Sequence, residues 1–457
     1  MSPDDTIAAI ATPLGEGGLA VVRLSGPRSL EIADRVFVPG GRAGVKPSAA
    51  TTHTLHYGRL LHQGQVVDEI LLSVMRAPRT FTREDVVELG CHGGLLVARM
   101  ALDTVLEQGA RLAHPGEFTR RAFLNGRIDL AQAEAVADLI HARTELALAA
   151  AHEQLAGHLS QRVNQLRDQL MLLLAHVEAY LDFPDEDLQP ETRTQILERL
   201  QQSLEGMDQL LSTAREGQIL RSGIRAAIIG RPNAGKSSLL NQLLGHDRAI
   251  VSPLPGTTRD TIEETANIRG VPVVFVDTAG LRDSGDLIEA EGMRRTRAML
   301  ERAEFVLHVL DASEPLTSAD EQYLGEFAGK KRLLVCNKAD LPRRLILPEP
   351  LLGKTVEVSC LSGQGVEALK EAIKSAVWSG AIETGMWQAM INSRHQDALR
   401  RAREAAVHTQ TALAANQPLD LVALDLRLAV NAIGEIVGKT ATEDLLDRIF
   451  SQFCIGK

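Results

Sequence analysis

The spacing of hydrophobic and polar residues changes several times along this 457-residue chain. In the first part, short apolar runs at residues 18–26 and 69–78 stand between glycine-rich turns, a spacing that predicts strands. Residues 93–110 have a helical spacing, and we expect this helix to end near Gly109. The pattern predicts an α+β domain over residues 1–122.

A helical pattern begins near Leu130. Apolar residues there recur at steps of three and four, which places them along one face of a long helix: Leu155, Leu159, Val163, Leu166, Leu170, Leu173 and Val177. Proline and acidic residues at 182–188 predict a loop. A second helical stripe follows the loop and consists of Ile196, Leu200, Leu204, Met207 and Leu211. These stripes predict buried faces of a helical domain over residues 123–220.

Strand-like and helical segments alternate over residues 221–380. Four apolar runs predict strands, and each ends in glycine or polar residues, where nucleotides bind in open parallel sheets: residues 224–230, 271–277, 305–311 and 332–337. Residues 381–457 are again mainly helical, and Thr440 with Glu443 could form a capping box for the last helix. We therefore expect an α/β domain inserted into a discontinuous helical domain.

Composition narrows the class of protein. The net charge of −10 argues against a chain-wide nucleic-acid surface, so RNA contact would need a local basic patch. The basic clusters at 294–297 and 400–403 lie in helical patterns and are interpreted as solvated helix faces. The four cysteines form no C-x-x-C pair, which speaks against a zinc site or a disulfide framework. With no long apolar run and no signal-peptide pattern, a cytoplasmic protein is expected without membrane contact.

The sequence GRPNAGKSS at residues 230–238 has the spacing of a phosphate-binding loop between a strand and a helix. Its glycines would let backbone N–H groups approach phosphates, Lys236 would supply a cation, and Ser237 would supply an oxygen to Mg²⁺. A plain glycine-rich turn is the alternative interpretation of this motif alone.

Further motifs follow in order. Thr258 in PGTTRD could complete the Mg²⁺ shell, Asp277 could support the metal, and the amide of Gly280 could sense the γ-phosphate. Asp340 in NKAD could accept two hydrogen bonds from guanine, which selects against adenine by up to about 10⁴–10⁵-fold. Leu281 stands where Ras-type enzymes place a water-orienting glutamine, so another group must position the water.

The chain resembles the MnmE, or TrmE, family of tRNA modification GTPases over essentially its full length. The resemblance rests on seven stretches: residues 5–26, 81–94, 114–140, 230–243, PGTTRD, DTAGLR and the terminal FCIGK. It implies a Ras-like P-loop GTPase domain inserted in the helical domain, and an N-terminal folate-binding-like domain that forms a homodimer.

The resemblance also implies an answer to the question that Leu281 raises. A K⁺ ion would replace an arginine finger, a role worth about 10³–10⁵ in rate, once two GTPase domains meet. The side chain of Asn233 and the carbonyl groups of Ser252, Leu254 and Thr257 would bind this ion. Glu289 would position the attacking water, and Lys236 and Gly280 would be the other two catalytic residues.

The motifs and the resemblance together give a set of GTP-binding residues. It consists of Asn233, Ala234, Gly235, Lys236, Ser237, Ser238, Ser252, Thr257, Thr258, Asp277, Gly280, Asn337, Lys338, Asp340, Ser359 and Cys360. The pair Ser359–Cys360 replaces the Ser-Ala of the usual GTPase pattern, which weakens the assignment of Cys360.

The resemblance places a tetrahydrofolate derivative, 5-formyl- or 5,10-methylene-tetrahydrofolate, on Arg23, Glu88, Arg127 and Lys457. The two guanidinium groups could hold the carboxylates of the folate and Glu88 could bind the pterin edge. From its spacing alone, Arg23 could equally be a solvent-facing strand residue. Cys454 near this site could be a nucleophile or a merely local thiol.

By resemblance, the protein works with a flavin-dependent partner called GidA or MnmG, in a heterotetramer or larger complex. The two would add an aminomethyl or carboxymethylaminomethyl group to C5 of the wobble uridine of tRNA. The alternative is a regulatory GTPase switch that binds ribosomes or RNA and forms no covalent tRNA product. A folate-dependent transferase acting alone fits less well, because no strand-linked G-x-G-x-x-G is present to carry a flavin.

Overall fold

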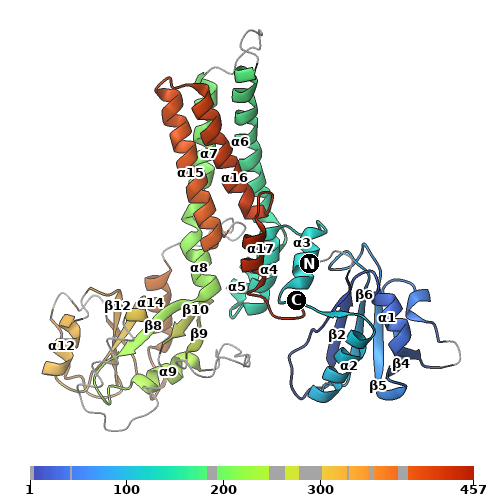
Figure 1. Cartoon of the computed structure of the whole chain (residues 1–457). Coiled ribbons are helices and arrows are strands. Elements are labelled where there is room, and N and C mark those ends of the chain that lie inside the picture. Colours follow the sequence, from blue (N-terminus) through green and yellow to red (C-terminus); the bar gives the residue numbers. More distant parts are fainter. Residues whose placement is uncertain are drawn as a thin grey trace. The chain divides into compact units, whose positions relative to one another are not determined.

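A computed structural model describes most of the chain (Figure 1). The described residues are 5–41, 44–182, 193–245, 263–276, 301–326, 329–348, 351, 355–378 and 390–457. The chain forms two compact units, one of Met1–Ala137 with Val430–Lys457 and one of Asp138–Ala429. The division falls within the helices α4 (Leu130–His141) and α16 (Leu419–Val437).

The first unit contains a seven-stranded sheet in the order β3-β4-β5-β6-β2-β1-β7. Its strands are β1 (Ile7–Ile10), β2 (Ala20–Ser25), β3 (Phe37–Pro39), β4 (Thr54–His62), β5 (Gln65–Met75), β6 (Val86–Cys91) and β7 (Arg111–Leu112). All neighbours are antiparallel except β1 and β7. The helices α1 (Ser29–Val36) and α2 (Leu95–Glu107) bury their apolar sides in the core of this sheet. The two predicted strands and the helix over 93–110 are thus confirmed.

Three helices of the first unit share a smaller apolar core: α3 (Glu117–Leu124), α4 and α17 (Glu443–Phe450). The predicted capping box of α17 is wrong. Thr442 caps the helix by accepting a hydrogen bond from the N–H of Leu445 at 3.4 Å, whereas the hydroxyl of Thr440 donates to the carbonyl of Asn431. The helix begins two residues later than the capping-box pattern suggested.

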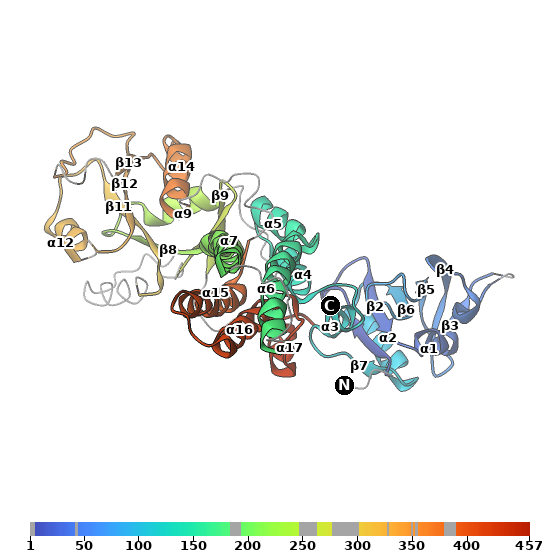
Figure 2. The same ribbon diagram turned by 90° about the horizontal axis from the view of Figure 1, so that it is seen from above.

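One part of the second unit consists of helices of 9 to 25 residues. They are α5 (Glu145–Leu155), α6 (His158–Asp182), α7 (Arg193–Ser212), α8 (Ala214–Ser222) and α15 (Ser393–Ala414). Helix α7 packs against both α6 and α15, as Figure 2 shows from above. Helices α6, α7 and α15 each bury an apolar side. The buried residues of α5 and α8, such as Ala147 and Ile219, join the core of the sheet described below.

The predicted stripe from Leu155 to Val177 is not one helix. Gly157 has a φ of +92°, which ends α5, so Leu155 is the last residue of that helix and the stripe of α6 starts at Leu159. In α7, Leu210 is buried and Leu211 is only half-buried, so the predicted stripe shifts by one residue at its end. Most of the predicted loop at 182–188 lies outside the described residues.

A six-stranded sheet in the second unit has the order β13-β12-β11-β8-β10-β9. Its strands are β8 (Ile224–Ile229), β9 (Glu264–Ile268), β10 (Val271–Phe275), β11 (Phe305–Asp311), β12 (Arg332–Asn337) and β13 (Thr355–Glu357). All run parallel except β9, which is antiparallel to β10. The four predicted strands are confirmed, and the strand order reverses at β8, a point where ligands bind in open α/β sheets.

Helices cover both faces of this sheet. The helices α9 (Lys236–Leu244) and α14 (Val366–Val377) share the larger core with the strands. Helix α12 (Ser318–Glu326) contributes Tyr323 to a smaller cluster that includes Ile229 and Val306. In the part of the chain that the structure describes, no helix combines the length and the hydropathy needed to cross a bilayer.

Candidate functional site

The phosphate-binding loop predicted from the sequence lies between β8 and α9. Three of its residues have a positive φ: Gly230 at +145°, Asn233 at +61° and Gly235 at +95°. A Cβ on Gly235 would lie 2.0 Å from Nδ2 of Asn337, and one on Gly230 would lie 2.3 Å from a main-chain oxygen of β11. Both glycines are therefore required by space as well as by conformation, whereas asparagine tolerates the left-handed region at Asn233.

Lys236 is the first residue of α9 and folds back over the loop. Its Nζ donates to the carbonyl oxygens of Gly230 at 2.9 Å and Arg231 at 2.8 Å. Burial lowers the pKa of Lys236, yet the two carbonyl oxygens fix its ammonium at the mouth of the loop. Ala234 is buried, and Ser237 and Ser238 occupy the first turn of α9, the end of a helix at which anions bind.

Asn337, at the end of β12, joins this loop to two others. Its Nδ2 donates to the carbonyl of Ala234 at 2.9 Å, and its Oδ1 accepts from the N–H of Cys360 at 3.2 Å. Lys338 has a φ of +65°, and its Nζ lies 2.5 Å from Oδ2 of Asp311. The side chain of Asn337 thus fixes the distance between the phosphate loop and the predicted guanine-binding loops.

Asp340 and Ser359, two of the predicted GTP-binding residues, also lie in contact. The buried Ser359 donates its hydroxyl to Oδ1 of Asp340 at 2.5 Å. Asp340 itself is exposed, so Ser359 orients its carboxylate while the residue stays accessible to solvent. This arrangement suits a group that accepts paired hydrogen bonds from a planar base.

Cys360 contributes through its backbone. Its carbonyl accepts from Nε2 of Gln242 at 2.8 Å, while its N–H binds Asn337. Burial, with a smaller contribution from Asp340, raises the pKa of its thiol to about 11, so the side chain stays neutral. A cysteine can therefore stand where other GTPases have alanine.

Seven predicted site residues lie outside the described residues. They are Ser252, Leu254, Thr257, Thr258, Asp277, Gly280 and Glu289. The predicted water-positioning residue and three of the four predicted K⁺ ligands are among them.

In the first unit, Arg23 and Glu88 face each other across β2 and β6. Nε of Arg23 lies 2.7 Å from Oε1 of Glu88, and Nη1 donates to the carbonyl of Gly456 at 3.3 Å. The guanidinium lies 5.8 Å from the ring centroid of Phe118. Arg23 is therefore held by three partners and is not a free surface residue.

The C-terminal tail is fixed beside this pair. The carbonyl of Lys457 accepts from the N–H of Phe118 at 3.1 Å, and that of Cys454 accepts from Gly116 at 3.4 Å. A Cβ on Gly456 would lie 2.5 Å from the carbonyl of Ile10, so the tail passes close to β1. Cys454 is exposed, whereas Cys91 and Cys336 are buried, as expected of packing residues.

Arg127, the second predicted folate-binding arginine, contacts a different ring. Its guanidinium lies 5.5 Å from the centroid of Phe81 and donates to the carbonyl of Thr80. Phe81 packs against the apolar cluster that contains Phe118, the ring under Arg23. The two arginines thus border one apolar cluster.

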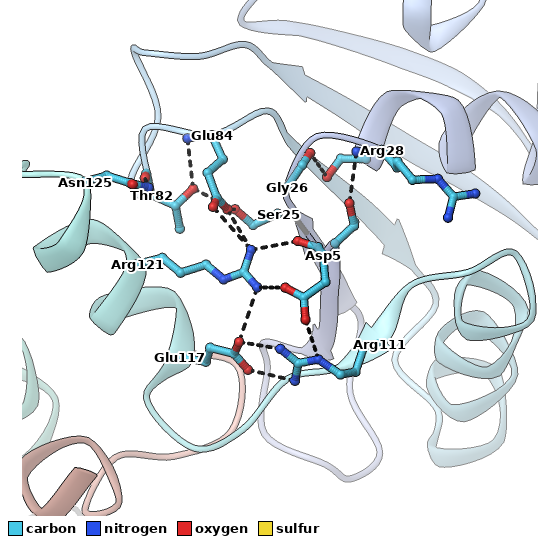
Figure 3. Close-up of polar contacts among 12 residues, drawn as sticks. Asp5, Ser25, Gly26, Arg28, Thr82, Glu84, Arg111, Glu117, Arg121 and Asn125 are labelled. Carbon is cyan, nitrogen blue, oxygen red and sulfur yellow. Dashed lines mark hydrogen bonds and ion pairs between the residues drawn. The ribbon is translucent and has the colours of Figure 1, made fainter. Parts of the chain in front are cut away.

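The sequence did not predict a partly buried ion network in the first unit (Figure 3). Arg121 pairs with Asp5, Glu84 and Glu117, and Arg111 pairs with Asp5 at 2.7 Å and with Glu117 at 2.6 Å. Burial raises the pKa of Glu117, but its bonds to Arg111 and to the backbone of His114 outweigh this and hold the pKa below its ordinary value. The spacing of Glu117 and Arg121 by four residues was the signal that could have indicated this contact.

The network fixes the start of α3 against the sheet. Glu117 is only 1% exposed, and Arg121 also donates to the carbonyl of Asp5, which leads into β1. The same start of α3 supplies Phe118, which touches Arg23 and the C-terminal tail. The ion network therefore holds the Arg23 site in place.

Comparisons with known proteins match the whole chain. Family models described as "MnmE helical domain" and "GTP-binding protein TrmE N-terminus" match residues 130–454 and 6–127. The tRNA modification GTPase MnmE of Geobacillus kaustophilus is 47% identical over 100% of both chains, and that of Listeria welshimeri is 46% identical over 99% of both. The G domain of the T. maritima FeoB iron transporter is 26% identical and covers 34% of this chain and 98% of its own, at a TM-score of 0.26.

The two family models and the observed sheets and helices confirm the expected fold class. An α+β N-terminal domain precedes a discontinuous helical domain, into which a Ras-like P-loop GTPase domain is inserted. The domain limits at residues 122, 220 and 380 remain predictions.

Proposed function

This chain belongs to the MnmE family of tRNA modification GTPases, and we propose that this GTP hydrolase serves the modification of a wobble uridine in tRNA. The GTP-binding part of this proposal rests on one observation: the side chain of Asn337 joins the phosphate loop to the predicted guanine-binding loops. A nucleotide bound there would contact both loops at once.

The residues of this junction fit a guanine nucleotide. A side chain at Gly235 would collide with the side chain of Asn337, so this position of the loop requires glycine. Lys236 and the first turn of α9 would face the phosphates. Asp340, held by Ser359, would accept the N1 and N2 hydrogens of guanine. Ser237 and Thr258 would hold Mg²⁺, with Asp277 in support.

Hydrolysis would rest on residues of the phosphate loop and of the two segments that follow it. Asn233 would bind K⁺ together with Ser252, Leu254 and Thr257. When bound, Mg²⁺ and K⁺ would neutralise the charge that develops on the phosphates. Glu289 would orient the attacking water and the amide of Gly280 would contact the γ-phosphate.

Two measurements test this hydrolysis proposal. GTP turnover by the full chain should be faster in KCl than in NaCl at equal ionic strength, and equal rates would contradict the K⁺ site. The variant Glu289→Ala should bind GTP and hydrolyse it poorly. Normal turnover by that variant in saturating K⁺ would remove Glu289 from the mechanism.

The N-terminal domain is proposed to bind a tetrahydrofolate derivative and to form the homodimer. The pair Arg23–Glu88 offers both a cation and a carboxylate, which fits a pterin edge and an acidic tail; Arg127 and Lys457 would complete the site. A bound 5-formyl- or 5,10-methylene-tetrahydrofolate would supply the one-carbon unit.

Folate titration of single variants tests this site. Arg23→Met should weaken binding of 5-formyl-tetrahydrofolate, while Arg59→Met, which alters an arginine exposed on β4, should not. Equal affinities of the two variants and the unaltered chain would contradict the site.

The chemistry on tRNA would require a flavoprotein partner. The proposed partner is GidA/MnmG, with which the homodimer would add an aminomethyl or carboxymethylaminomethyl group to C5 of the uridine in the cytoplasm. GTP turnover would open and close the GTPase domains and would not itself make the carbon bond.

A further inference from the structure

A cluster of charged side chains lies beside the phosphate loop. Arg231, the second residue of the loop, has a side chain that is 14% exposed, with Nη2 2.5 Å from Oε2 of Glu314. The same nitrogen lies 3.8 Å from Oδ2 of Asp311, and Nε lies 3.8 Å from Oδ2 of Asp320. The side chains of Asp311 and Asp320 are 3% and 4% exposed. Three carboxylates, two of them buried, thus surround this guanidinium.

Asp311 is shared between two loops. Its Oδ2 faces Arg231 and also lies 2.5 Å from Nζ of Lys338, in the guanine-binding loop. Its Oδ1 accepts from both the N–H and the hydroxyl of Ser313, at 2.9 and 2.6 Å. Burial raises the pKa of Asp311, but the bonds from Lys338 and Ser313 outweigh burial and keep the pKa below its ordinary value. The shared group is therefore a fixed carboxylate anion.

The main chain of Arg231 acts on the phosphate loop from the other side. Its carbonyl oxygen accepts from Nζ of Lys236 at 2.8 Å, next to the carbonyl of Gly230. A movement of Arg231 would displace an acceptor that holds this ammonium. One residue thus connects the acidic cluster to the cation that faces the phosphates.

We propose that Arg231 is a positioning residue of the nucleotide site. Its guanidinium ties the phosphate loop to Asp311, the carboxylate that also holds Lys338, so that the two nucleotide-binding loops are fixed relative to each other before a nucleotide arrives. This inference deepens the proposed GTP site and rests on it. An arrangement fixed in advance improves affinity because less ordering remains to be done on binding.

Charge balance gives Arg231 a second effect. Three carboxylates face two cations in the cluster: Asp311, Glu314 and Asp320 against Arg231 and Lys338. Without the guanidinium, three carboxylates face one cation beside a loop that must bind a polyanion. GDP and GTP both carry the diphosphate, so both should lose affinity.

The test uses the full chain and a fluorescent GDP analogue. Arg231→Met should weaken GDP and GTP binding by roughly tenfold to a hundredfold, and it should raise KM by a larger factor than it lowers kcat. Arg231→Lys should recover part of the affinity, because lysine keeps the charge but not the planar fork. Arg225→Met is the matched control. This arginine of β8 is exposed, and its Nη2 lies 3.8 Å from Oε1 of Glu263.

The conservative variant keeps the test decisive if Arg231→Met does not fold. Arg231→Lys retains a cation among the three carboxylates, so it should fold and still bind GDP about two- to tenfold more weakly than the unaltered chain. Normal GDP affinity in every folded variant, or a fall in kcat with unchanged affinity, would overturn the inference. Failure of the unaltered chain to bind GDP would instead refute the nucleotide site itself.

Discussion

Replacing Asp340 by asparagine should change which base this chain binds. In the structure, Oδ1 of Asp340 accepts from Ser359 and the residue stays accessible to solvent. Asparagine keeps one acceptor oxygen but replaces the other with an NH2 group that would face a donor of guanine, so one of the two proposed hydrogen bonds would be lost. Hydrogen bonds to a charged group contribute about 1.5–3 kcal/mol each. The loss of one corresponds to a loss of roughly 10–10²-fold in GDP affinity, and the two opposed donors add to it.

The assay is a competition titration with GDP and xanthosine diphosphate. Xanthine has a carbonyl where guanine has the C2 amino group, so it can accept from the new amide. We expect Asp340→Asn to bind xanthosine diphosphate more tightly than GDP, with the exposed Asp397→Asn of α15 as control. Unchanged GDP affinity would refute the assignment of Asp340. An equal loss for both nucleotides would show that the loop had merely lost its structure.

Three further predictions concern the ion network and the phosphate loop. Glu117→Gln removes a buried carboxylate from between two arginines and should cost about 3–5 kcal/mol of the free energy of unfolding; a urea midpoint equal to that of the unaltered chain would contradict this. The pKa values of Asp5 and Glu117 are held below normal by their arginine partners despite burial, so their stabilisation is complete at neutral pH and is lost as the pH falls. The thermal midpoint should therefore drop between about pH 5 and pH 3, and less steeply in Glu117→Gln. Gly235→Ala, whose Cβ would meet Nδ2 of Asn337 at 2.0 Å, should weaken GDP binding by about tenfold or more; normal binding would show that the loop can rearrange.

The nucleotide loops could be predicted from the sequence because each is a short motif at the end of a buried strand. The spacing around Lys236 and the run before Asp340 were enough to place both at one edge of a parallel sheet. The contact that joins them could not be predicted, because Asn337 and Ala234 are 103 positions apart. Hydrophobic periodicity carries no information about such a pairing of side chains.

Helix limits and buried charges were harder to predict for different reasons. The stripe that starts at Leu155 continues in register across Gly157, so its spacing alone does not reveal the break. The ion pair of Arg121 with Asp5 joins residues 116 positions apart, and charged residues are ordinarily expected at the surface. Only the folded α3 brings these groups together.

Nucleoside mass spectrometry of tRNA from cells that lack this chain tests the central claim most directly. The account predicts loss of the C5 group from the wobble uridine, restored by the unaltered chain but not by a variant with Gly235→Ala. Normal wobble uridine modification in those cells would contradict it and would favour a regulatory GTPase that forms no covalent tRNA product.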